Sequence, residues 1–206
     1  GQLLGLALNT AKIMALNKNA QQTLQKVAFL GHAKDTRLTG LLNNKSVEVY
    51  AIKGAAQNSK VQAMDFDKAV AFFKEIFLQG MEKTKRIEAP NTFAIDSLDL
   101  AHLALTQRAN TDTTALEFLT KHLSAAAGRE VAIKALPSNY GTQVTKDKTR
   151  AMVYVNSKEH VIFDVPMSPT VLDAQPKGLL AFESGLRMAF GGVTFMEPDS
   201  ALYVDY

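Results

Sequence analysis

The sequence predicts a mixed α+β fold, and three observations support that prediction. Residues 3–30 form a long helical pattern without proline, in which apolar residues recur at spacings of three, four and seven. Further helical patterns lie between residues 65 and 128. From residue 130 onward, short apolar stretches separated by polar turns are typical of strands. Residues 47–52 also alternate like a strand, so we expect the two ends of the chain to meet in one sheet.

The apolar stripe of the first predicted helix is narrow. The remaining faces carry Asn, Gln and Lys, so only one side of the helix is apolar. Residues 3–30 would form a helix about 40 Å long. We therefore expect it to lie across a surface or to support a sheet, and to end at Gly31, a residue type that caps helix C-termini. The stripe consists of Leu6, Ile13, Leu16, Ala20, Leu24 and Val27.

The second predicted helix is apolar over more than half of its circumference, so we expect it to be buried. It follows a polar loop at residues 53–60, begins after Asp65, a favourable N-cap residue, and runs to about Arg86. Basic residues near its end suit the negative pole of the helix dipole. Its apolar residues are Phe66, Ala69, Val70, Phe72, Phe73, Ile76, Phe77 and Met81.

Two shorter helices and six strands complete the prediction. Thr114 and Glu117 have the spacing of a capping box, which marks the start of the last helix. Gly191 and Gly192 indicate a bend or bulge in an otherwise extended stretch. The predicted helices cover residues 96 or 97 to 108 and 114–128, and the predicted strands cover 92–95, 131–136, 151–155, 161–165, 178–195 and 201–205.

The amino-acid composition excludes several classes of function for this chain. The 206 residues suffice for one large domain or two small ones that share a sheet. The absence of cysteine excludes disulfides, thiolate catalysis and zinc–thiolate sites. A net charge of +3, from 23 basic and 20 acidic residues, is smaller than dedicated DNA-binding proteins usually carry. No apolar run is long enough for a membrane-spanning helix.

Candidate catalytic groups are sparse. None of the four histidines has the spacing of a zinc-protease motif, and no glycine-rich phosphate loop or nucleophile elbow is present. The sequence therefore predicts no catalytic, cofactor-binding or metal-binding residues and no enzyme. Carboxylate pairs occur where helices are predicted to begin, which favours a capping role. These pairs are Asp65 and Asp67, Asp96 and Asp99, and Asp112 and Glu117.

Two alternatives of other classes remain open at this stage. One is a small α+β hydrolase or transferase that uses Asp96, Asp99 and His102, which would have to converge in a deep pocket. The other is a monomeric nucleic-acid-binding module that uses the basic cluster Lys83, Lys85 and Arg86. A solvated helix end explains that cluster more simply.

Several stretches, in this order and over essentially the whole chain, resemble tailed-bacteriophage major capsid proteins of the Hong Kong 97-like fold. The first stretches resemble the long spine helix of that fold and its exit turn, and the next two resemble helix entries of its axial domain. The last stretch resembles the return strand into the peripheral domain. The stretches are Phe29-Leu30-Gly31 with residues 39–43, then 90–96, 110–118, and finally 178–193 with 203–205.

The resemblance implies a structural shell subunit and no catalytic site. It implies a peripheral domain of residues 1–60 and 180–206 and an axial domain of residues 61–179. Family members carry an N-terminal arm and an extended hairpin before the spine helix, and nothing in this sequence corresponds to either. Because these parts clasp neighbouring subunits, we expect this chain alone to be monomeric or weakly associated. No cross-linking residue is assigned.

The resemblance also implies partners and a location. Copies of the chain would form pentamers and hexamers of an icosahedral shell around double-stranded DNA, assembled in the cytoplasm of a bacterial host and ending in the virion. Scaffold, portal and decoration proteins are further expected partners, with weak, non-specific contacts to DNA on the inner face. No membrane partner and no cofactor are expected. The nearest rival is an encapsulin-like nanocompartment shell, which has the same fold but encloses a cargo enzyme.

Overall fold

The computed structural model describes residues 2–52, 60–164, 167–171, 175–176, 182–183, 186–189 and 191–206. The predicted loop at residues 53–60 lies almost wholly outside this part. The chain divides into two compact units. The first unit comprises Gly1–Leu41 and Phe163–Thr194, and the second comprises Leu42–Ile162 and Phe195–Tyr206.

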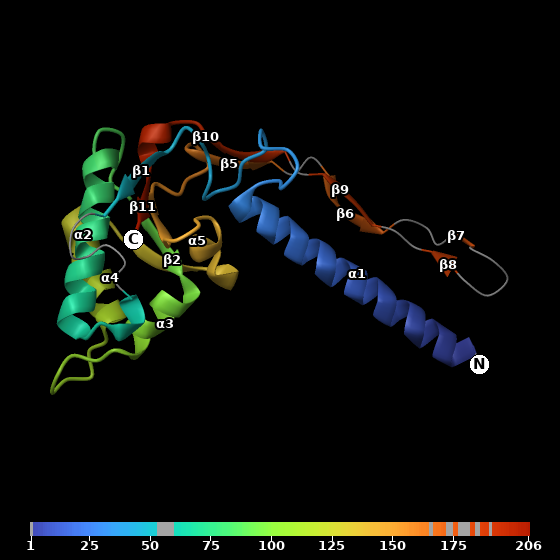
Figure 1. The fold of residues 1–206 in the computed structure, drawn as a ribbon, viewed down its shortest axis with the longest axis horizontal. Coiled ribbons are helices and arrows are strands. Elements are labelled where there is room, and N and C mark those ends of the chain that lie inside the picture. Colours follow the sequence, from blue (N-terminus) through green and yellow to red (C-terminus); the bar gives the residue numbers. More distant parts are fainter. Residues whose placement is uncertain are drawn as a thin grey trace. The chain divides into compact units, whose positions relative to one another are not determined.

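The first unit is built on helix α1, Gln2–Leu30, which matches the predicted long helix (Figure 1). The helix ends at Gly31, whose φ of 75° is left-handed and whose N–H donates to the carbonyl of Val27 over 2.9 Å. The predicted glycine cap is thus confirmed. Among the residues of α1 whose burial is described, Ala20 alone is buried. A helix with so little buried surface has most of its faces open to other contacts.

Helix α1 contacts two strands of the same unit, β6 (Met167–Val171) and β9 (Leu186–Ala189). These strands pair antiparallel, with an irregularity in register between Met167 and Thr170. The pairs β5 (Val161–Asp164) with β10 (Gly192–Phe195) and β7 (Gln175–Pro176) with β8 (Phe182–Glu183) precede and follow them along the chain. The described strands of this stretch therefore pair in a nested order, with β5 and β10 as the outermost pair and β7 and β8 as the innermost pair. The predicted bend is found at Gly192, which has a φ of 98°.

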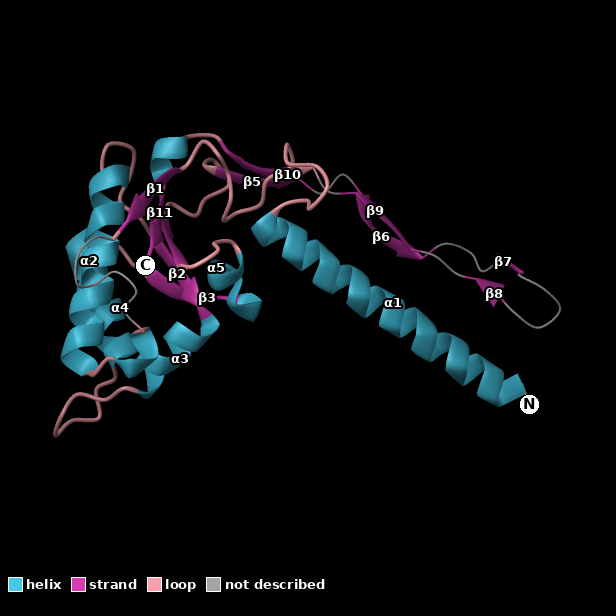
Figure 2. Ribbon diagram, in the orientation of Figure 1, coloured by secondary structure: helices cyan, strands magenta, loops and turns pink. Residues whose placement is uncertain are grey.

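The second unit contains a five-stranded sheet of order β1-β11-β4-β2-β3 (Figure 2). Strand β11 runs parallel to β1 and antiparallel to β4, while β2 runs antiparallel to β4 and parallel to β3. The first and last strands of the chain thus pair directly, as predicted. The strands are β1 (Glu48–Ala51), β2 (Thr92–Asp96), β3 (Ala132–Leu136), β4 (Arg150–Tyr154) and β11 (Ala201–Asp205).

The compact units differ in range from the predicted domains. The sequence places residues 1–60 and 180–206 together and 61–179 apart from them. In the structure β11 is hydrogen-bonded on both sides, to β1 and to β4, so both ends of the second unit's chain belong to one sheet. Within the first unit, the strands that contact α1 are β6 and β9.

Helices α2 (Phe66–Thr84), α3 (Ser97–Leu105) and α4 (Ala115–Ala127) follow the predicted helices closely. Asp65 caps α2 by accepting a hydrogen bond from the backbone N–H of Lys68 over 2.9 Å. Thr114 and Glu117 form the predicted capping box of α4. Within the described residues, four short helices were not predicted, namely η2 (Val61–Ala63), η3 (Pro137–Asn139), α5 (Tyr140–Gln143) and η4 (Pro198–Ser200).

The main core lies between one face of the sheet and helices α2 and α4, which lie side by side (Figure 1). Side chains alternate along each strand, so every second residue of β2, β4 and β11 faces this core. Buried residues of α2 supply four aromatic rings to it, which confirms that this helix is buried. The core residues on the strands are Phe93, Ile95, Ala151, Val153, Leu202 and Val204, and those on the helices include Phe66, Phe72, Phe73, Ile76, Phe77, Leu119 and Leu123.

Candidate assembly surface and the buried carboxylate cluster

Asp96 lies at the end of β2 and is buried. One carboxylate oxygen, Oδ1, accepts a hydrogen bond from the N–H of Gly141 over 2.7 Å. The other, Oδ2, accepts from the N–H and the hydroxyl of Thr142 over 2.9 and 2.6 Å. Burial raises the pKa of Asp96, although these three hydrogen bonds oppose that shift. Asp96 therefore holds the first turn of α5, and not the start of its own helix α3 as predicted.

Asp99 lies in the first turn of α3 and is also buried. It accepts hydrogen bonds from the phenol of Tyr206 over 2.5 Å and from the side-chain amide of Gln62 over 2.9 Å. Burial raises the pKa of Asp99, and burial together with the adjacent Asp99 raises the pKa of Tyr206. The carboxylate thus joins η2, α3 and the end of the chain. Its role is to connect three segments of the core.

His102 does not complete an acid–base group with these carboxylates. Its Nε2 lies 2.8 Å from the carbonyl oxygen of Met64 and 3.3 Å from the hydroxyl of Thr106. Asp96 and Asp99 line an open cavity of about 310 Å³, but His102 is not among the residues of its wall. The three residues therefore do not converge on one pocket, and the donors around each carboxylate are structural. This geometry gives the enzyme alternative no support.

The basic cluster at the end of α2 is largely neutralised by acids of the same unit. The Nζ of Lys83 lies 2.7 Å from Glu48 and 3.1 Å from Asp199. Two hydrogen bonds raise the pKa of Lys83, and the one to Glu48 contributes more than the one to Asp199. The Nζ of Lys85 lies 2.6 Å from Glu82. Two of the three residues of the nucleic-acid-binding alternative, Lys83 and Lys85, are thus engaged with carboxylates, so this cluster is not a strongly basic surface.

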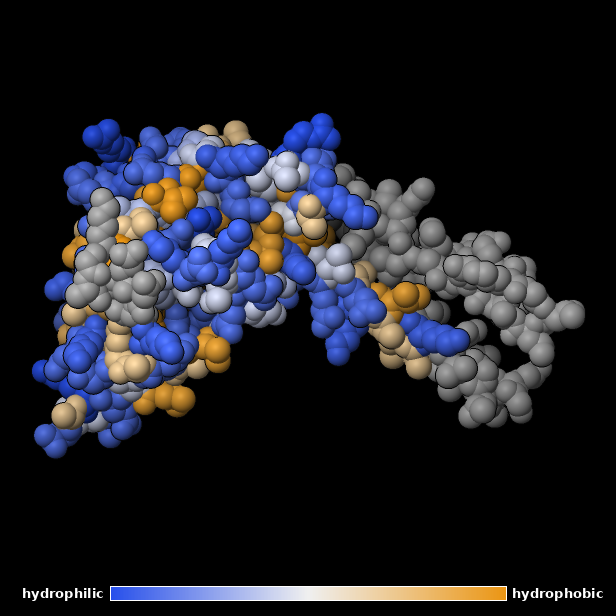
Figure 3. Space-filling model, viewed as in Figure 1, coloured by the Kyte–Doolittle hydropathy of each residue, from blue (hydrophilic) through white to orange (hydrophobic). Residues whose placement is uncertain are grey.

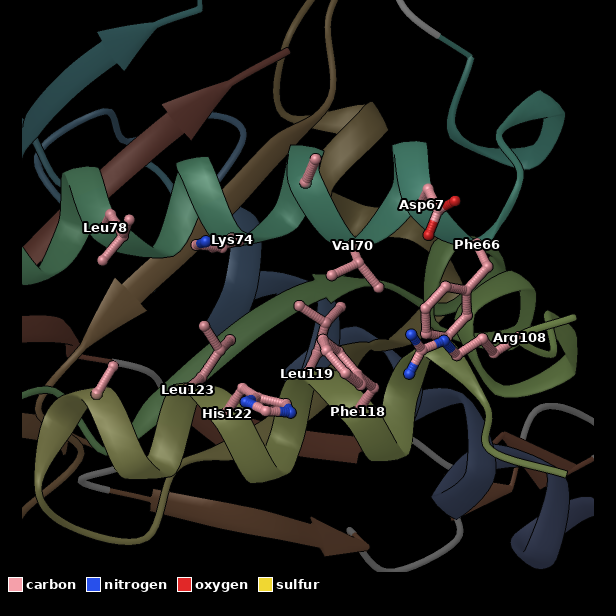
Figure 4. Close-up of a pocket in the computed structure, with 12 residues that line it drawn as sticks. Phe66, Asp67, Val70, Lys74, Leu78, Arg108, Phe118, Leu119, His122 and Leu123 are labelled. Carbon is pink, nitrogen blue, oxygen red and sulfur yellow. The ribbon is translucent and has the colours of Figure 1, made fainter. Parts of the chain in front are cut away.

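A groove of about 470 Å³ lies between α2 and α4 in the second unit (Figure 4). Phe66 and Phe118 meet edge to face at its base, with ring centroids 5.5 Å apart. Lys74 and Arg108 add positive charge, and Asp67 adds negative charge. The groove is mainly apolar, as binding grooves usually are. Its wall consists of Phe66, Asp67, Val70, Ala71, Lys74, Leu78, Arg108, Phe118, Leu119, His122, Leu123 and Ala126.

Large apolar side chains also project from the surface. Figure 3 shows apolar patches scattered among polar ones on the face in view. Leu105, at the end of α3, is 83% exposed, and Met196, directly after β10, is 57% exposed. Neither residue lines the groove, and exposed apolar side chains of this size are candidates for contacts with other proteins. Sequence periodicity could not reveal the groove, because its two sides are helices that begin 49 positions apart in the chain, at Phe66 and Ala115.

Two other kinds of site are absent from the described residues. No helix there is both long and apolar enough to cross a bilayer. No group of three or more His, Cys, Asp or Glu side chains in the same part of the chain is arranged to hold a metal ion.

Known proteins provide a direct comparison. The major capsid protein family model matches residues 1–206. No curated protein matches the chain. Among solved structures, the fold is similar to the capsid of Myoviridae phage XM1, at 11% identity and a TM-score of 0.77, over 96% of this chain and 65% of that one. A virus-like particle from Pyrococcus furiosus matches at 11% identity and a TM-score of 0.52, over 78% of this chain and 57% of that one.

The chain thus spans less than two thirds of the length of these two structural relatives. At such low identity the likeness shows the fold alone, and it confirms the predicted α+β capsid fold. The family match covers the whole chain and confirms the resemblance on which a structural shell role was predicted. The chain belongs to the major capsid protein family.

Proposed function

We propose that this chain is a subunit of the icosahedral shell of a tailed double-stranded DNA bacteriophage, and that its copies form pentamers and hexamers around the genome. The observation that carries the proposal is the family match over residues 1–206, together with the fold shared with the phage XM1 capsid. The buried carboxylates support it, because Asp96 and Asp99 serve the core and leave no visible acid–base pair. The proposed role is structural and non-enzymatic.

The first unit corresponds, in this proposal, to the peripheral domain, because it contains the long spine helix α1. The second unit, with its five-stranded sheet and three longer helices, corresponds to the axial domain. This assignment differs from the domain limits expected from sequence, which stay a prediction. Its support is the pairing of β11 with β1 and β4, which joins residues 42–162 and the chain's last strand in one sheet.

The exposed surface of α1 supports a role in assembly. Its described side chains are mostly exposed, including Met14 at 66%. A 29-residue helix with so little burial gains stability when neighbouring copies cover it. Scaffold, portal and decoration proteins are proposed as further partners, with assembly in the host cytoplasm. Contacts with DNA would be weak and non-specific, because Lys83 and Lys85 are already paired with acids.

The test is the composition of purified particles. Mass spectrometry of virions from an infected culture should find this chain among the most abundant proteins, and electron microscopy should show closed icosahedral shells that contain DNA. Particles that contain a protein cargo and no genome would instead identify a nanocompartment shell. A chain that stays in the soluble lysate and is absent from every particle would refute both shell functions. Light scattering of the isolated chain separately tests its expected weak association.

A further inference from the structure

The second unit exposes a methionine, Met196, with two glutamates nearby, and none of these three residues lines the α2–α4 groove. Met196 is 57% exposed, and its N–H donates to the carbonyl of His160 over 2.8 Å. This bond places Met196 beside the turn that contains Glu159, and Glu197 follows it directly. Both glutamates are exposed, and neither forms an ion pair with the described residues. We refer to Met196, Glu159 and Glu197 as the Met196 knob.

The groove has the opposite charge pattern. Lys74 lies along α2 and Arg108 lies at the end marked by Phe66 (Figure 4). Neither cation forms an ion pair within the described part of the chain. Asp67 offsets one of the two positive charges of the groove, which therefore keeps a net positive charge. Lys158 offsets one of the two negative charges at the knob, which therefore keeps a net negative charge. An apolar groove with net positive charge is complementary to an apolar knob with net negative charge.

The knob and the groove share no residue, so one copy can present its knob while its groove is occupied. Contacts of this head-to-tail kind generate rings when the rotation between copies closes. Met is among the residues enriched at protein interfaces, because its flexible side chain adapts to an apolar recess. The groove of about 470 Å³ has ample room for one methionine side chain.

We propose that the Met196 knob of one copy docks in the α2–α4 groove of the next copy around a ring. The proposal rests on the proposed shell function and names one contact through which the copies associate. Glu159 and Glu197 would then face Lys74 and Arg108. Leu105 is more exposed than Met196, but its neighbours on α3, Ala101 and Ala104, and the following Thr106 and Gln107 are uncharged. Leu105 therefore lacks charge complementarity to the groove and serves as a matched control.

Because the chain has no cysteine, engineered thiols can test this contact directly. A Met196→Cys chain is mixed with a His122→Cys chain, since His122 is exposed and lines the groove. Under mild oxidation, disulfide-linked heterodimers should form about tenfold faster than with Leu105→Cys in place of Met196→Cys, because docking raises the effective concentration of the thiols. A chain with both Met196→Cys and His122→Cys should form a ladder of linked oligomers.

Charge reversal provides the second arm. Lys74→Glu with Arg108→Glu in the His122→Cys chain should slow heterodimer formation about tenfold, and Glu159→Lys with Glu197→Lys in the Met196→Cys chain should restore it. Equal rates for the Leu105 control, or no linkage up to the solubility limit, would overturn the docking proposal. Failure of the proposed shell function would be detected separately, because mass spectrometry would then not find the chain in purified virions. Shells that contain the chain but do not link at these thiols contradict the contact alone.

Discussion

Gly80 lies four residues before the end of helix α2, where it faces strand β4 closely enough that a single methyl group should destabilise the second unit. A Cβ at this position would lie 2.3 Å from the Cβ of Val153 and 2.5 and 2.7 Å from its two methyl groups. Val153 is fully buried and β-branched, so neither its backbone nor its rotamer can yield readily. The substitution Gly80→Ala therefore requires α2 to move away from the sheet.

Two opposing effects set the magnitude. Alanine is favoured over glycine in a helix interior by about 1 kcal/mol. Overpacking of a dense core costs about 1–3 kcal/mol, and the upper end applies here because the clash joins a helix backbone to the base of a strand side chain. A loss of about 2 kcal/mol in the free energy of unfolding is therefore expected. For a protein of this size, it corresponds to a fall in Tm of about 4–8 °C.

Urea denaturation followed by far-ultraviolet circular dichroism measures this change at equilibrium. Gly128→Ala is the control, because a Cβ there meets nothing within 4 Å and the cost comes only from the left-handed φ of 69°. That control should lose about 1 kcal/mol from backbone strain. In a Val153→Gly background, Gly80→Ala should cost less stability than it does in the wild type, whereas the cost of Gly128→Ala should be unchanged. A Gly80→Ala protein as stable as the wild type would refute the close helix–sheet contact.

Three further substitutions test the buried polar groups. Arg150→Met should lower the free energy of unfolding, measured by urea titration, by about 3–5 kcal/mol. The substitution leaves the carboxylate of Asp205, which is only 11% exposed, without the guanidinium whose Nε lies 2.8 Å from its Oδ1. The double variant Arg150→Met with Asp205→Asn should lose less stability, because no buried charge is then left unpaired. For Asp99, burial raises the folded-state pKa above its ordinary value of 3.8, so the folded state binds the proton more tightly. Stability should therefore rise as pH falls from neutral toward 3.8, and Asp99→Asn should reduce this rise in thermal melts across that range, whereas an unchanged pH profile would contradict it. The hydroxyl of Ser200 is buried without a hydrogen-bond partner in the described residues, so Ser200→Ala should change stability by less than about 1 kcal/mol, and a larger loss in urea would reveal an unseen partner.

Local patterns predicted most of the elements because their causes are local. The spacing of apolar residues in α1 and the glycine at its end determine a helix and its stop, and both were found at the expected positions. The capping box at Thr114 is likewise local, since its two hydrogen bonds join residues three apart. Strand β11 was also found where expected, at Ala201–Asp205.

The neighbours of those elements could not be predicted in the same way. Strand β11 reads as a strand, but nothing in five residues specifies that it pairs with β4, about 50 positions earlier. Asp96 reads as a cap of its own helix, yet it binds Gly141 and Thr142 in a helix of four residues, too short to show periodicity. Ser138 and Asn139 adopt left-handed conformations just before that helix, and neither residue type alone predicts them.

The acidic residues show why function left no motif in this sequence. Asp96 and Asp99 resemble a candidate acid–base pair in sequence, and burial moves the pKa of each in the direction that catalytic acids require. Their oxygens nevertheless accept hydrogen bonds from α5, η2 and Tyr206, so the perturbed pKa values follow from joining segments of a core. Glu159 and Glu197 have no ion-pair partner among the described residues, and neither do Lys74 and Arg108. In the proposed shell, these unpaired charges on two separate surfaces would pair between copies, which is a contact that one copy cannot make alone.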